Sequence, residues 1–192
     1  TAENALFGTA GSHSLYPLFA AADPDKSRAK AISSDMPVRT IRQFWDVDGL
    51  VLMWREESGK GIAATPFSFF WPSWDAVTLD GTQVTFWQLT ISTPQAHRLS
   101  KKGFIDALPL LERDRTARIV WVVPEHKLDA ALEGSAVRVE AAPDWLKGIK
   151  QFVVSVKSPI EALAAGGAGA AAAALPAAAP TAAAPAAALP AA

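Results

Sequence analysis

The feature that most constrains the fold is an uninterrupted apolar run at residues 119–123, Ile-Val-Trp-Val-Val, which ends at Pro124. Polar residues do not alternate with apolar ones in this run, so other parts of the protein must cover both faces of the strand it predicts. Strands covered on both faces are typical of sheets that carry helices. The run therefore predicts an α/β fold with a central sheet.

Capping residues and apolar spacing predict a first helix of about ten residues from Ser34. Ser34 and Asp35 are good capping residues, Pro37 suits the first helical turn, and Val38 and Ile41 recur at helical spacing. The apolar stretch at 50–54 fits either a short helix or a strand.

The remaining patterns predict a mixed sheet with helices packed against it. Residues 62–91 are rich in β-branched and aromatic side chains around Asp80 and Gly81, which indicates a β-hairpin or meander. Trp87 and Leu89 are expected on one face of its second arm and Gln88 and Thr90 on the other. Further along the chain, we expect a helix at 125–133, strands at 136–139 and 150–156, and a last helix from 158. This order favours a mixed sheet flanked by helices.

Composition divides the chain into three parts. All seven Trp and nine Phe precede residue 166, whereas residues 166–192 are nearly all Ala and Pro. Regularly spaced prolines interrupt helix formation there, and alanine alone cannot offset the entropy of ordering, so a disordered tail is expected. Residues 1–32 are interpreted as a lead segment whose apolar cluster at 15–19 docks on the domain, and residues 33–165 as the α/β domain.

Charge and residue usage exclude several functional classes. The chain has 18 Lys and Arg against 19 Asp and Glu, a net charge of −1, which argues against a globally basic nucleic-acid binder but leaves room for a local basic patch. The absence of Cys excludes Cys-based zinc sites, catalytic thiols and disulfides. No apolar run is long enough to span a bilayer, so no membrane partner is expected.

Three polar residues on consecutive predicted strands form the main candidate site. Asp75 and Gln88 lie at comparable distances from the turn at Asp80, so pairing of the two arms would bring them together. Thr90 follows on the same face as Gln88. Metal-dependent phosphodiester hydrolysis needs oxygen ligands for a hard cation such as Mg²⁺, which Asp75 and Gln88 could provide. The alternative is a purely structural polar pair at the end of a sheet.

A basic stretch follows this pair and leads into another predicted helix. Its residues are His97, Arg98, Lys101 and Lys102, which are candidates for phosphate contacts beside the site. The alternative is a solvated helix start. The aromatic run at 67–74 similarly fits either base stacking or a strand-pair core, and the core is the favoured interpretation.

Several motifs occur together in a characteristic order. Residues 86–91, Phe-Trp-Gln-Leu-Thr-Ile, are followed by His97 and by Lys-Gly-Phe at 102–104. Upstream, Trp71 and Pro72 lead to Asp-Ala-Val at 75–77. Together with the later strands at 119–124 and 150–154, these motifs resemble the Crinkler effector family and the related trypanosome retrotransposon hot spot proteins. The resemblance covers about residues 65–157.

The resemblance implies a restriction-endonuclease-like fold of the PD-(D/E)XK group. Asp75 would be its strand aspartate, and Gln88-Leu89-Thr90 would stand where active enzymes have acid-x-lysine. The sequence departs from that pattern at Gln88 and Thr90, and Glu57 or Glu56 would have to supply the upstream acid. The resemblance implies that Asp75, Gln88 and Glu57 hold Mg²⁺ for DNA hydrolysis, in a protein secreted and then acting in a host nucleus. The alternative is a catalytically inactive module of this fold that binds a protein or nucleic-acid partner.

Overall fold

The computed structural model describes residues 6–8, 10–20, 30–56, 61–67, 73–105, 115–139 and 144–157, and a single mixed sheet dominates this part of the chain. The sheet has eight strands in the order β2-β1-β8-β7-β6-β5-β4-β3. In sequence order, the strands are β1 (Gly11–Leu18), β2 (Ile32–Met36), β3 (Thr40–Phe44), β4 (Ile62–Pro66), β5 (Ala76–Asp80), β6 (Gln83–Leu89), β7 (Thr116–Pro124) and β8 (Lys150–Val156). Short helices connect them: α2 (Val47–Glu56), α3 (Lys101–Ile105), α4 (Leu128–Glu133) and α5 (Asp144–Lys147), with 3-10 turns η2 (Pro94–Ala96) and η4 (Glu125–Lys127).

Strand directions confirm the predicted α/β class with a mixed sheet. β6, β7 and β8 run parallel to one another, β3 runs parallel to β4, and the other neighbouring pairs are antiparallel. The central β7 is buried between β6 and β8, as its apolar run predicts.

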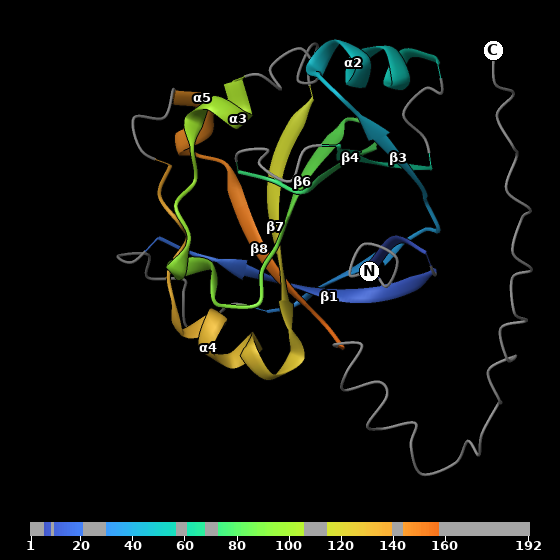
Figure 1. Ribbon diagram of the computed structural model, residues 1–192. Helices are drawn as coiled ribbons and strands as arrows, with labels where there is room; N and C mark the ends of the chain where they lie inside the picture. The colour runs from blue at the N-terminus through green and yellow to red at the C-terminus, as the bar shows by residue number, and fades with distance from the viewer. Residues whose placement is uncertain are drawn as a thin grey trace, which may run out of the picture.

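The sheet is strongly curled. Its two outermost strands, β2 and β3, are consecutive in the sequence and are separated only by residues 37–39. Figure 1 shows β1 lying across the direction of β6 and β7. One face of the sheet is therefore turned inward, where Leu6, Phe7, Leu15 and Met36 pack with strand residues such as Trp87.

Helices cover the other face of the sheet. Leu50 and Trp54 of α2, Phe104 of α3, Ala131 of α4 and Leu146 of α5 join one buried cluster. Strand side chains from that face, including Val77, Phe86, Ile119 and Trp121, complete this cluster. Figure 1 shows these helices distributed around the sheet, with α2 at one end and α4 at the other.

The helix predicted from Ser34 is wrong, because this stretch forms β2 and β3. Each strand buries its last residue, Met36 or Phe44, against the sheet. Pro37 falls in the connection, where no ladder hydrogen bond is required of it. Local capping signals are worth about 1 kcal/mol, and strand pairing with burial outweighs them here.

Other predicted elements are confirmed with small changes. The predicted hairpin is formed by β5 and β6 and turns at Gly81, whose φ of 58° suits glycine. Residues 50–54, which fitted either a helix or a strand, are helical and belong to α2. Residues 125–133 form η4 and α4, and 150–156 form β8. The strand predicted at 136–139 is wrong: the described residues show one isolated bridge there, between Leu99 and Val139.

The expected lead segment contributes a strand to the sheet. β1 pairs with β2 on one side and with β8 on the other, and its Leu15 and Leu18 are buried. The predicted last helix and the Ala/Pro-rich tail lie outside the described residues. In the described part of the chain, no helix has the length and apolar character needed to cross a bilayer.

Candidate functional site

Asp75 and Gln88 meet where β5 begins and β6 ends. The Gln88 side-chain amide donates to Asp75 Oδ2 at 2.8 Å, and the backbone N–H of Leu89 donates to the same oxygen at 2.7 Å. The Asp75 backbone N–H bonds to the carbonyl of Trp87 at 2.7 Å, which extends the ladder by one residue. The predicted proximity of Asp75 and Gln88 is therefore confirmed, and the carboxylate ties the two strand ends together.

Thr90 lies just beyond Leu89 and shares a hydrogen bond with His97. The Thr90 hydroxyl is 2.5 Å from His97 Nε2, and the N–H of Ser92 donates to that hydroxyl at 3.0 Å. The His97 ring also packs near Trp121 of β7, with ring centroids 5.8 Å apart. Thr90 is thus held in place by the connection after β6, and His97 is brought to the end of that strand.

Two side-chain contacts hold the start of α3 beside Asp75. The Ser73 hydroxyl donates to the Ser100 carbonyl and accepts from the Ser100 N–H, both at 2.7 Å. The indole N–H of the buried Trp74 donates to the Gly103 carbonyl at 3.1 Å. Since Ser73 and Trp74 directly precede Asp75, these bonds place the predicted basic stretch next to the Asp75–Gln88 pair.

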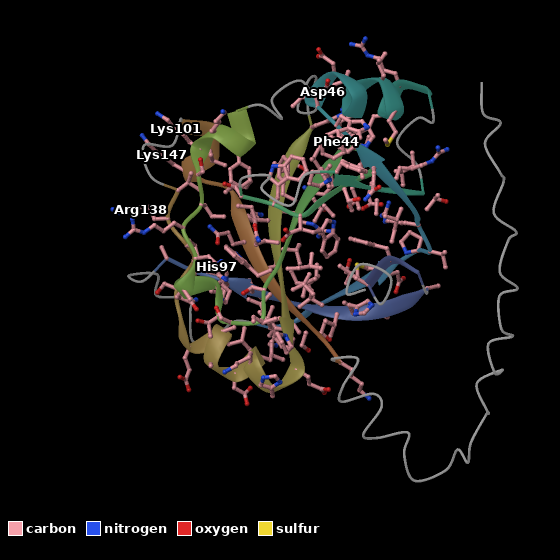
Figure 2. All side chains as sticks on the ribbon, viewed as in Figure 1. Phe44, Asp46, His97, Lys101, Arg138 and Lys147 are labelled. Carbon is pink, nitrogen blue, oxygen red and sulfur yellow. The ribbon has the colours of Figure 1, made fainter. Side chains whose placement is uncertain are left out.

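The basic residues near Asp75 divide into two groups. His97 and Arg98 line a hollow of about 360 Å³ that Arg138 also lines, while Lys101 and Lys102 are exposed at the start of α3. Figure 2 shows His97, Lys101 and Arg138 along one side of the molecule. Arg138 was missed from the sequence, because nothing in its local pattern links residue 138 with residue 97.

An exposed aromatic pair was also missed. Trp45 follows β3 and Phe67 follows β4, and their rings stack with centroids 3.8 Å apart. Trp45 is 74% exposed and Phe67 is 47% exposed, although the aromatic run at 67–74, which includes Phe67, was expected in the core. The ring centroid of the preceding Phe44 lies 5.9 Å from that of Trp74, the neighbour of Asp75. The Trp45–Phe67 pair therefore lies at the same end of the sheet as Asp75.

The described residues do not supply a complete site for Mg²⁺. They contain no group of three or more His, Cys, Asp or Glu side chains that could share an ion. Asp75 Oδ2 accepts two N–H groups, and the Thr90 hydroxyl is bonded to His97, whereas Mg²⁺ requires an octahedral set of oxygens. Glu57, the acid implied by the resemblance, lies outside the described residues, and the described donor set does not fit the ion without it.

A second polar cluster lies at the opposite end of the sheet and has structural roles. Arg39 is buried and forms an ion pair with Asp80, and Arg118 Nε donates to the Thr85 hydroxyl at 2.9 Å. Burial lowers the pKa of the Arg118 guanidinium, an effect that Asp80 partly opposes and Arg39 reinforces. The Arg118 guanidinium also lies 5.9 Å above the Phe152 ring. The ion pair with Asp80 and the contact with the Phe152 ring offset part of the cost of burying these cations on the inward face.

Comparisons of this chain with protein-family models, with curated proteins and with solved structures found no match.

Proposed function

We propose that this chain is a Crinkler-like, nuclease-derived module that binds DNA at the end of the sheet where Asp75 lies. One observation carries the proposal: the Ser73–Ser100 and Trp74–Gly103 hydrogen bonds anchor a basic stretch beside the Asp75–Gln88 pair. Basic side chains held next to the Asp75–Gln88 pair are suited to phosphate contacts. Such contacts supply most of the affinity of non-specific DNA binding.

The net charge of −1 agrees with a local rather than a global binding surface. One hollow is lined by three basic residues from two separate segments, His97, Arg98 and Arg138. The fold therefore brings together basic side chains that lie far apart in the sequence. The exposed Trp45–Phe67 pair adds a stacking surface for bases at the same end of the sheet. By resemblance alone, the DNA would belong to a host nucleus reached after secretion.

Metal-dependent hydrolysis of DNA is the second candidate function. The side-by-side placement of Asp75 and Gln88 on neighbouring strand ends favours it, because this is the placement that a strand-borne ligand pair requires. It further requires a second carboxylate, for which Glu57 is the candidate. The incomplete donor set among the described residues makes binding without cleavage the better supported proposal.

Binding and cleavage are separated by one set of measurements. Fluorescence anisotropy with labelled DNA, with and without Mg²⁺ or Mn²⁺, would measure affinity, and supercoiled plasmid would report cutting. We expect micromolar affinity that falls with added salt, and intact plasmid. The triple variant Arg98→Ala, Lys101→Ala, Lys102→Ala should lower the affinity, whereas Arg55→Ala on exposed α2 should not.

Two results would change the conclusion. Metal-dependent cutting that Asp75→Asn abolishes would establish the hydrolytic candidate. Failure of the folded protein to bind any DNA would refute both candidates and leave a protein partner as the remaining alternative.

A further inference from the structure

A half-open groove lies far from Asp75 in the sequence. It has a volume of about 1240 Å³ and lies between the end of β1, the segment 135–139, the end of α5 and the start of β8. Phe19, Ile32 and Phe152 are among its apolar lining residues. Ile32 is 52% exposed, so this apolar surface is open to solvent.

The polar backbone of the groove wall is already satisfied. Gln151, which is buried, donates to the Val137 carbonyl at 2.7 Å and accepts from the Val137 N–H at 3.0 Å. The Ala136 N–H donates to the Phe19 carbonyl at 2.9 Å. These bonds tie the backbone of Ala136 and Val137 to the rest of the fold, so Val137 offers a ligand mainly apolar contact.

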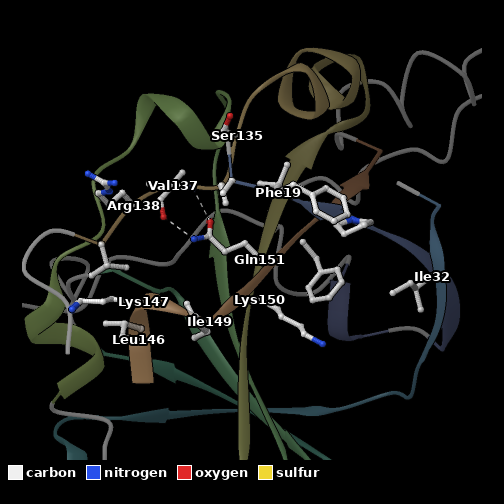
Figure 3. A pocket seen from close by; sticks show the side chains of 17 residues that line it. Phe19, Ile32, Ser135, Val137, Arg138, Leu146, Lys147, Ile149, Lys150 and Gln151 are labelled. Carbon is white, nitrogen blue, oxygen red and sulfur yellow. Dashed lines mark hydrogen bonds between the residues drawn. The ribbon is translucent and has the colours of Figure 1, made fainter. Parts of the chain in front are cut away.

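The charged residues of the groove all have one sign. Arg138, Lys147 and Lys150 line it, and none of its described lining residues is acidic. Figure 3 shows Arg138 and Lys147 on one side of the groove and Phe19 and Ile32 on the other, with Lys150 between them. The groove is therefore amphipathic, with a cationic side and an apolar side.

We propose that this groove binds a single-chain anionic amphiphile, namely a medium-chain fatty acid. Its carboxylate would pair with Arg138 and Lys147, and its alkyl chain would lie across the apolar wall toward Phe19 and Ile32. Small-molecule sites generally have about 300–1,000 Å³, so this groove has room for a chain of this kind. The proposal does not rest on DNA binding, but a bound fatty acid and DNA would compete for Arg138, which also lines the hollow shared with His97 and Arg98.

Titration calorimetry with the full chain and octanoate, decanoate or dodecanoate, below micelle formation, would test this proposal. We expect saturable one-site binding in which Kd falls about fourfold for each added CH₂ that becomes buried. Arg138→Glu should weaken dodecanoate binding at least tenfold, and so should Ile32→Asp, which places a carboxylate on the exposed apolar side.

Matched controls separate binding in the groove from loss of folding. Arg55→Glu and Val38→Asp introduce the same charges at exposed positions that do not line the groove, and circular dichroism would verify folding. Unchanged binding in Arg138→Glu and Ile32→Asp, equal weakening in the controls, or no saturable binding would overturn the proposal. Equal affinity for inorganic phosphate would also overturn it, since the apolar wall would then have no role.

Discussion

Asp75 has a structural role that any test of its function must take into account. Its Oδ2 accepts the Gln88 amide and the Leu89 N–H, so the carboxylate closes the end of the β5–β6 hairpin whether or not it contacts a ligand. A loss of activity in an Asp75 variant is therefore informative only when stability is measured as well.

We expect Asp75→Ala to destabilise the protein by about 1–3 kcal/mol, because two N–H donors lose their acceptor in a half-buried place. Asp75→Asn should cost less than half as much, since its side-chain oxygen still accepts. Urea denaturation measures both values. Equal stability of the two variants and the native protein would show that these hydrogen bonds are not maintained in solution.

Gln151 provides a second test at a single residue. Its side chain accepts from Trp121 Nε1 and Val137 N–H and donates to the Val137 carbonyl, all within a buried environment. Gln151→Met keeps the volume but leaves these groups unpaired, so we expect a loss of about 3 kcal/mol in urea denaturation. Gln83→Met, which breaks exposed bonds to Thr116, is the control and should cost less than about 1 kcal/mol. Comparable losses in the two variants would show that the buried hydrogen bonds of Gln151 contribute no more to stability than the exposed ones of Gln83.

At the scale of elements, the ends of β3, β4 and β6 determine what the proposed DNA-binding surface would recognise. An exposed stacked pair of rings offers its faces only to bases that have left their own stack. We expect Trp45→Ala to weaken binding of single-stranded DNA by about 1–3 kcal/mol and to leave duplex binding nearly unchanged. Anisotropy with matched oligonucleotides measures this, and Leu52→Ala, another exposed apolar position, is the control. An equal loss for single strands and duplex would refute base stacking.

Two kinds of element were predictable from the sequence: a strand whose two faces are both buried, and a hairpin with a characteristic turn. β7 has an apolar run, the β5–β6 hairpin has Asp80-Gly81, and both are confirmed. The stretch at 34–44 was misread because its edge strands are mostly exposed, so their apolar spacing resembles that of a helix.

The candidate site was predictable only where it depends on short-range register. Asp75 and Gln88 face each other across one hairpin, so counting from the turn is sufficient. Arg138 lines the same hollow as His97 only because the fold brings two distant segments together, and the Ser73–Ser100 link depends on a loop with φ of 77° at Ser73. No local sequence pattern indicates either arrangement.

At the scale of the whole molecule, β1 is an interior strand of the sheet rather than a segment attached to its surface. β1 lies between β2 and β8, and Leu15 and Leu18 belong to the clusters on opposite faces of the sheet. A chain that starts at residue 33 would leave β8 with an unpaired edge and would expose both clusters, so the predicted boundary at residue 33 has a direct physical test.

We expect the chain 33–192 to lose cooperative unfolding, because β2 and β8 lose their common neighbour and the inward face loses its cover. The chain 1–165, which lacks only the Ala/Pro-rich part, should unfold within about 2 °C of the full chain, since such a sequence has little apolar side-chain surface to bury. Differential scanning calorimetry of the three chains makes the comparison. Cooperative unfolding of 33–192 at the full-chain temperature would show that residues 1–32 are separable from the domain. A large drop for 1–165 would show that residues 166–192 contribute to its stability.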